Sequence, residues 1–144
     1  GSPLFTIGAS FNAGATGRVL DLEVLEIEKK IRLGADFFIT SPIFDIDQFT
    51  EIMEKVRPFK TPVIATVMIL KSVGMARYIN KHIDGVMVPD AVIGRMMKEP
   101  DKEKASIEIT ASLIRSLQAL CQGVCIQPIG WESKVPQVLD ACGF

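Results

Sequence analysis

Thr40, Ser41 and Asp45 are the polar residues in this sequence best placed to do chemistry. Thr40 and Ser41 end a short apolar stretch that begins at Phe37, and Asp45 follows four residues later. In parallel α/β sheets, ligands bind at the carboxyl ends of the strands, which is where this pair lies. Thr40 could equally satisfy nearby backbone, and Asp45 could serve only as the N-cap of the next helix. Both interpretations stay open on the sequence.

Two further polar residues lie inside apolar stretches. Thr66 interrupts the run that starts at Pro62, and Gln127 ends the run that starts at Val124. A polar group buried in a sheet costs free energy unless it finds a partner. Ligand contact and an internal hydrogen bond are both consistent with this pattern. Trp131, just beyond the last run, is expected either to cover a site or to pack against its rim.

The segment from Gly8 to Gly17 is rich in small residues, which permit a close approach of backbone to a ligand. It lacks the Lys-Ser/Thr of a P-loop and the glycine spacing of the dinucleotide fingerprint. A flexible loop and a ligand-binding loop remain equal alternatives. On the helix that follows, Glu26, Lys29 and Lys30 are spaced for solvated ion pairs. The functional alternative is that this helix borders a cofactor, with Lys30 at a phosphate.

Several classes of site are disfavoured. His82 is the only histidine and lies at an expected helix end, so Ser-His-Asp chemistry is not indicated. Cys121, Cys125 and Cys142 are odd in number and fit neither a disulfide framework nor a zinc pattern. We therefore expect free thiols, no metal site and a reducing, cytoplasmic location.

The composition indicates one globular domain. The chain has 144 residues, 48% of them hydrophobic and 23% charged, with a net charge of −1. Its basic residues are dispersed, which argues against a nucleic-acid partner. No apolar run approaches the ~20 residues of a membrane span. We interpret residues 1–2 as a tag remnant and residues 3–144 as a single α/β domain.

Apolar periodicity predicts alternating strands and helices. Strands are expected at residues 4–9, 37–40, 62–68 and 124–128; helices are expected at residues 20–33, 45–57, 71–82, just after Pro89, 101–123 and 132–142. Right-handed crossovers make such a sheet parallel. Four units are about half of a (β/α)8 barrel, whose usual length is ~250 residues. The predicted fold is therefore a partial TIM barrel of about four C-terminal βα units. A small open parallel α/β sheet is the alternative.

With these residues placed, the chain resembles the C-terminal half of the methylenetetrahydrofolate reductase family. The most specific block is the helix, Gly-Ala-Asp, strand and Phe-Asp sequence that spans residues 25–45. Weaker similarities lie at residues 5–12, 62–70, 88–89 and 123–124. The resemblance implies a (β/α)8 barrel that binds FAD and passes a hydride from a reduced electron donor to methylenetetrahydrofolate.

The resemblance also implies roles for individual residues. Family members place FAD along the positions of this chain that are occupied by Ser10, Asn12, Glu26, Lys29 and Lys30. The family usually has Gln on the folate at the position of Ser41, so the serine is a departure. Gln127 and Trp131 fall where the family completes its folate pocket.

The resemblance assigns the family's catalytic carboxylates to the first half of the barrel, so this chain holds none of them. We expect the full-length parent to be an FAD-dependent oxidoreductase, and this chain alone to be inactive. A free half-barrel would expose sheet edges, so self-association or a partner chain is expected. Two alternatives remain: a non-catalytic half-barrel that completes a barrel with a partner, and a flavin-independent folate or corrinoid methyl-transfer barrel.

Overall fold

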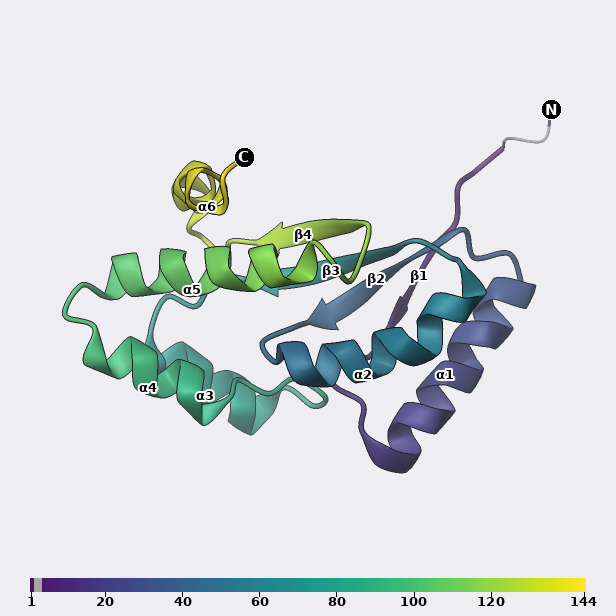
Figure 1. Cartoon of the computed structure of the whole chain (residues 1–144), viewed down its shortest axis with the longest axis horizontal. Coiled ribbons are helices and arrows are strands. Elements are labelled where there is room, and N and C mark those ends of the chain that lie inside the picture. The colour runs from purple at the N-terminus through teal and green to yellow at the C-terminus, as the bar shows by residue number, and fades with distance from the viewer. Residues whose placement is uncertain (2–3) are drawn as a thin grey trace.

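Four parallel strands in the order β1-β2-β3-β4 form the centre of the computed structural model, which describes residue 1 and residues 4–144 (Figure 1). The strands are β1 Gly8–Phe11, β2 Phe37–Pro42, β3 Val63–Met68 and β4 Gly123–Gln127. The helices are α1 Gly17–Arg32, α2 Ile46–Val56, α3 Val73–His82, α4 Asp90–Lys98, α5 Lys102–Leu117 and α6 Val135–Cys142, with 3-10 turns at Arg57–Phe59 and Glu132–Lys134. The sheet is open, with β1 and β4 as its edges. The predicted α/β fold is therefore confirmed, and both a partial barrel and an open sheet are consistent with it.

One face of the sheet, which we call the outer face, is sealed by helices. In β3, Val63, Ala65 and Val67 are completely buried and pack with α1, α2 and α5. Phe38 of β2 is also completely buried and meets Phe11 edge-to-face at a ring distance of 5.8 Å. Because side chains alternate along a strand, the neighbouring residues must point the other way.

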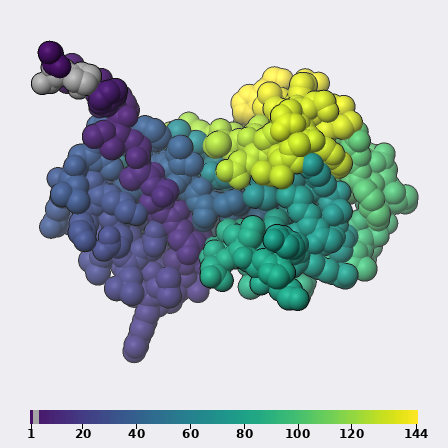
Figure 2. Space-filling view, turned by 180° about the vertical axis from the view of Figure 1, so that it is seen from behind, coloured from purple at the N-terminus to yellow at the C-terminus, as the bar shows by residue number. Residues whose placement is uncertain are grey.

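The opposite, inner face carries the alternate residues of each strand. They are Gly8 and Ser10, Phe37 and Ile39, Ile64, Thr66 and Met68, and Gly123, Cys125 and Gln127. Most are half-buried or exposed, and 37% of Ile39 is accessible to solvent. The view from behind shows blue atoms between the purple N-terminal segment and the yellow C-terminal part of the chain (Figure 2). No described helix seals this face as the outer face is sealed.

A second, smaller hydrophobic core is built mainly from residues that lie between β3 and α5 in the sequence. Leu70, Ala76, Ile79, Val88 and Met96 pack together there, with α3 and α4 as its walls. Met68, at the end of β3, packs against the same cluster. The connection between β3 and β4 therefore forms its own layer beside the end of the sheet.

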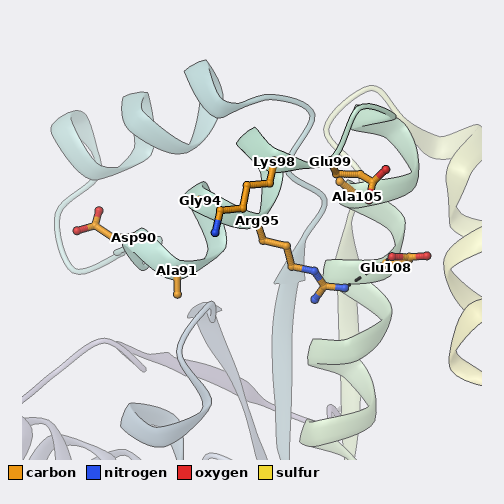
Figure 3. Close-up of a pocket in the computed structure, with 8 residues that line it drawn as sticks. All are labelled: Asp90, Ala91, Gly94, Arg95, Lys98, Glu99, Ala105 and Glu108. Atoms are coloured by element: carbon orange, nitrogen blue, oxygen red, sulfur yellow. Dashed lines mark ion pairs between the residues drawn. The ribbon is translucent and has the colours of Figure 1, made fainter.

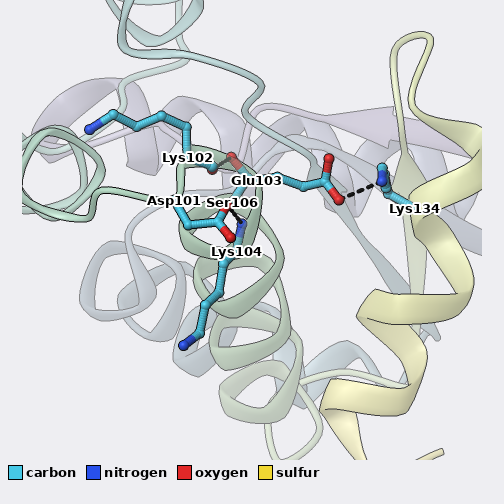
Figure 4. A network of polar contacts seen from close by, with 6 residues as sticks. All are labelled: Asp101, Lys102, Glu103, Lys104, Ser106 and Lys134. Carbon is cyan, nitrogen blue, oxygen red and sulfur yellow. Dashed lines mark hydrogen bonds and ion pairs between the residues drawn. The ribbon is translucent and has the colours of Figure 1, made fainter.

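Polar contacts fix the helices around this second core (Figure 4). Asp101 caps α5 by accepting from Lys104 N at 3.0 Å. Lys102 Nζ donates to the carbonyls of Met96, Met97 and Glu99 at 3.0, 3.0 and 2.6 Å, which satisfies the end of α4. Glu103 pairs with Lys134 of the turn before α6, and the buried Ser106 hydroxyl donates to Leu70 O.

The first strand was predicted in the wrong place. It covers Gly8–Phe11. Leu4, Phe5 and Ile7, which precede it, are exposed, with relative solvent accessibilities of 102%, 76% and 52%. The pairing of β1 with β2 begins at Gly8 and Phe37, so earlier residues have no neighbouring strand. Among the described residues before β1, Ile7 is held by two hydrogen bonds: its N–H donates to the Asp36 carboxylate, and its carbonyl accepts from Asp36 N. The predicted boundary between the tag remnant and the domain falls on Ser2 and Pro3, which lie outside the described residues.

The helix predicted to run to Gly123 is also shorter than expected. It ends at Leu117, whose carbonyl accepts from the backbone N–H groups of Leu120 and Cys121 in a closing turn. Gln122 then accepts from Val63 N at 2.8 Å and joins this turn to β3. Residues 85–88 form a loop between α3 and α4, and the helix predicted at residues 132–142 begins as a 3-10 turn. Within the described residues, no helix has the length and apolarity to cross a membrane.

Candidate functional site

The loop after β1 lies at the carboxyl end of the sheet and is held by side chains from three elements. Its residues 12–15 are half-buried or buried. Glu23 of α1 accepts from Asn12 N at 2.8 Å, and Gln48 of α2 donates to Gly14 O at 2.7 Å. Asn12 Oδ1 accepts from Gly14 N at 2.9 Å and tightens the turn. Hydrogen bonds from these elements therefore hold the backbone of the loop in place.

Ser41 of β2 also contacts this loop, in addition to Glu23 and Gln48. Its Oγ accepts from Ala13 N at 3.0 Å and lies 3.4 Å from Asn12 Oδ1. The neighbouring Thr40 has the backbone role that the sequence left open, because its Oγ1 donates to Ser41 O at 2.7 Å and accepts from Thr66 N at 3.0 Å. This bridge spans the register shift between β2 and β3. Asp45 likewise caps α2, accepting from Gln48 N at 3.1 Å.

The loop also touches the segment between α3 and α4. A Cβ at Gly14 would lie 2.1 Å from Gly85 O, and a Cβ at Gly85 would lie 2.6 Å from Asn12 Nδ2. Gly85 has φ +75°, a conformation that glycine adopts without strain. The absence of both side chains permits the close approach of these two loops.

The charged residues of α1 divide into two groups. Lys30 Nζ donates to Ser10 O at 2.7 Å, at the unpaired edge of β1. Glu26 and Lys29 instead face solvent, with 54% and 65% of their side chains exposed, and lie 3.7 Å apart. The solvated pair expected from the spacing is therefore present for Glu26 and Lys29. Lys30 is the member of the group that lies at the sheet.

Thr66 carries an unsatisfied polar atom on the inner face. The residue is 1% exposed, and its Oγ1 has no hydrogen-bond partner among the described residues. Its side chain alternates with Ala65 and Val67 and so points away from the helix-covered core. Cys125 is its register partner in β4, and Gln127 follows two residues later on the same face.

The end of β4 forms a tight turn. Trp131 N donates to Pro128 O at 3.1 Å, while Ile129 and Gly130 have φ values of +47° and +77°. Positive φ is unusual for a β-branched residue, so Ile129 holds strained backbone at this edge. Trp131 is half-buried and packs against the main core, which fits the rim-packing alternative.

The structure thus brings Ser10, Asn12, Lys30 and Ser41 together at β1 and β2. Gln127 and Trp131 lie at β4, separated from β2 by the whole of β3. The sequence did not predict Glu23, Gln48 or Gly85 as contacts of the loop. Local spacing carries no signal for contacts whose partners are 11 and 34 residues apart.

A cavity of about 720 Å³ lies away from this edge of the sheet, between α4 and α5 (Figure 3). Arg95 and Glu108 face each other across it at 3.7 Å. None of the residues predicted for the site lines it.

Elsewhere, burial raises the pKa values of the Cys121 and Cys142 thiols. Among the described residues, no group of three or more His, Cys, Asp or Glu is placed to hold a metal ion.

Comparison with known proteins identifies relatives of the chain. A family model described as methylenetetrahydrofolate reductase matches residues 9–143. A solved structure from Clostridium thermocellum, described as binding two copies of 5-methyl-5,6,7,8-tetrahydrofolic acid, is similar with a TM-score of 0.60 and 16% identity. The match covers 94% of this chain and 51% of that protein, so this chain spans about half of its length. No curated protein matches the chain.

Proposed function

The chain belongs to the methylenetetrahydrofolate reductase family, and from that premise we propose that it forms one wall of a folate-binding flavoprotein barrel. In the complete protein, the reaction would reduce methylenetetrahydrofolate to methyltetrahydrofolate. The observation that carries the proposal is the inner face of the sheet, which no described helix seals and whose carboxyl end holds Gln127 and the unpartnered hydroxyl of Thr66. This edge is where barrels of this kind bind ligands.

The residues at β1 are compatible with FAD in part. Lys30 has an ammonium group at the sheet edge with a backbone carbonyl as its partner, so it can also pair with a phosphate. Ser10 is exposed beside it, and Asn12 has a free amide donor at the same end. Glu26 and Lys29 neutralise each other on the solvent side and would contribute less. When bound, FAD would accept and pass on a hydride, whereas these residues would hold and orient it.

The folate contacts would come from farther along the same edge. The Thr66 hydroxyl is buried and unpartnered on the inner side of the sheet, the half-buried Gln127 lies on the same side, and Trp131 packs against the main core beyond β4. The relative from Clostridium thermocellum is described as binding 5-methyltetrahydrofolate, which supports a folate ligand for this fold. Gln127 can both donate and accept, as the edge of a pterin requires.

The proton donor would come from a second wall. The inner-face positions of the four strands carry no carboxylate, histidine, lysine or arginine. A reductase site needs groups on both sides of the flavin, so four further βα units are required. A preceding segment of a longer protein or a second copy of this chain would supply them. This proposal includes the non-catalytic alternative, in which the chain acts only by completing a barrel.

Separate titrations of the purified chain with FAD and with 5-methyltetrahydrofolate test the proposal. We expect saturable binding of both ligands, followed by flavin absorbance and by calorimetry. Lys30→Met should weaken FAD binding about tenfold, as expected for loss of one charge-assisted contact, and leave folate binding unchanged. Lys55→Met, on α2 and paired with Asp21 away from the proposed site, is the control and should change neither. Failure of the wild-type chain to bind folate, alone or with an added N-terminal half, would contradict the proposal.

A further inference from the structure

We propose that Ser41 is a positioning residue whose hydroxyl orders the β1–α1 loop, so that the Asn12 amide donor is presented to a bound heteroaromatic ring. This inference rests on the proposed function, because it assigns the contact that reads the ligand at the same edge. It separates two roles that the sequence could not separate: Ser41 acts on the loop, and Asn12 acts on the ligand.

The hydrogen-bonding capacity of Ser41 is used within the protein. Its Oγ accepts from Ala13 N at 3.0 Å, which directs the hydroxyl hydrogen towards Asn12 Oδ1 at 3.4 Å. A serine hydroxyl has one donor, and here that donor points at the loop. Ser41 could donate to a ligand only by giving up its contact with Asn12 Oδ1, and the bond from the buried Ala13 already occupies one of its two lone pairs.

The orientation of the Asn12 amide follows from its donors. Gly14 N and the Ser41 hydroxyl both donate to Oδ1, at 2.9 and 3.4 Å, so the oxygen is fixed on the inside of the turn. Nδ2 must then point outwards, and it has no acceptor among the residues that the structure describes. Asn12 is half-buried, so this donor pair is accessible but not freely solvated.

Neighbouring residues pack around the Asn12 amide and fix its position. Gly85 lies directly against Nδ2, since a Cβ there would approach to 2.6 Å. Glu23 and Gln48 hold the backbone on the other sides at 2.8 and 2.7 Å. The loop therefore cannot turn the amide away without losing several hydrogen bonds. A ligand would gain a pre-oriented donor at little entropic cost.

The complementary ligand group is a carbonyl oxygen on a heteroaromatic ring. Flavin and pterin rings both carry such a group, so FAD and 5-methyltetrahydrofolate form separate arms of the test. Asn12→Asp keeps the oxygen that accepts from Gly14 and Ser41 but removes the outward donor. Ser41→Ala removes both loop contacts, and Ser41→Thr retains the hydroxyl. Ser116→Ala, an exposed serine on α5, is the matched control.

Hydrogen exchange of the Ala13 amide in the ligand-free chain tests the loop contact. We expect about tenfold faster exchange in Ser41→Ala and wild-type exchange in Ser41→Thr, Asn12→Asp and Ser116→Ala. Unchanged exchange in Ser41→Ala would overturn the positioning role. If Asn12→Asp itself speeds exchange, Asn12→Ser replaces it, because a serine hydroxyl can cap the same turn.

Titration of each variant with each ligand tests the amide contact. Asn12→Asp should weaken binding of one ring about tenfold while Ala13 exchange stays normal, and the affected ligand identifies the ring. Ser41→Ala should weaken the same ligand, with rescue by Ser41→Thr. Unchanged affinity for both ligands in Asn12→Asp would overturn the contact. A wild-type chain that binds neither ligand overturns the proposed function and the amide contact, whereas Ala13 exchange still decides the role of Ser41.

Discussion

The two faces of the sheet are built from the same four strands yet differ in almost every property. On the outer face, Phe38, Val63, Ala65 and Val67 are completely buried beneath helices. On the inner face, most of the neighbouring strand residues are half-buried or exposed, and the buried Thr66 carries a hydroxyl without a partner among the described residues. The outer face accounts for the fold, because it holds the apolar core. The inner face is chemically unfinished, which is expected of a surface that meets a ligand or a second wall.

The contrast also separates stability from function within single strands. Burial of an apolar side chain stabilises a protein by about 1.5–3 kcal/mol, and this gain is concentrated on the outer side. Inner residues contribute less to folding and are free to serve recognition. The loop after β1 is held both by hydrogen bonds and by Ala13 and Ala15, which are buried in the main core.

Phe37 and Phe38 provide the largest test of this contrast, because they are adjacent and identical in type. Phe38→Ala should lower the free energy of unfolding by about 3–5 kcal/mol, the usual cost of removing a fully buried phenylalanine. Phe37 is half-buried and its ring lies across Gly8, within 2.5 Å of a Cβ built there, so Phe37→Ala should cost roughly 1 kcal/mol. Urea denaturation measures both. Equal losses would show that the inner face is also a core.

Thr40 and Thr66 form a second matched pair with opposite expected signs. Thr40→Val removes the acceptor of Thr66 N and should destabilise the chain by about 1–3 kcal/mol. Thr66→Val removes an unpaired buried hydroxyl without changing its shape, and should stabilise it by about 1 kcal/mol. Thermal unfolding followed by circular dichroism measures both changes. Destabilisation by Thr66→Val would show that its hydroxyl is satisfied, and would weaken the case for an unfinished inner face.

How far the sequence predicted these features depends on how local they are. The spacing of Leu20 and Ile27 predicted the buried stripe of α1, and Gly34, with φ +103°, follows that helix as a left-handed residue. The strands at β2, β3 and β4 were found because apolar runs mark them. The family resemblance supplied the general location of the site.

The features that the sequence did not predict depend on contacts between residues far apart in the chain. The first strand begins at Gly8 because its pairing with Phe37 decides where it starts, and apolarity at residues 4–7 gives no information on pairing. The hydrogen bond from Ala13 to Ser41 joins residues 28 positions apart. Sequence patterns read over one or two turns cannot detect such a bond.

Ile39 offers a test in which stability should hardly change. It lies 37% exposed on the inner face, so Ile39→Lys should alter the free energy of unfolding by only about 0.5 kcal/mol. If a second wall covers this face, the buried charge should abolish self-association or binding of an N-terminal half, as measured by analytical ultracentrifugation. Leu22→Lys on α1, where 63% of the residue is exposed, is the control. Loss of association in the control alone would place the contact on the helices instead.

The smallest expected effect is a difference in alkylation rate among the three cysteines, which is measured on the unsubstituted chain. Burial raises the pKa values of Cys121 and Cys142, which lowers their thiolate fractions at any given pH and slows alkylation. Cys125 lies on the inner face beside Thr66. We therefore expect iodoacetamide at pH 8 to label Cys125 first, as resolved by peptide mass spectrometry. Folate, FAD or a second wall should protect Cys125, with Cys121 and Cys142 as internal references. Equal protection of all three thiols would indicate global stabilisation and not cover of the inner face, because only Cys125 lies on that side of the sheet.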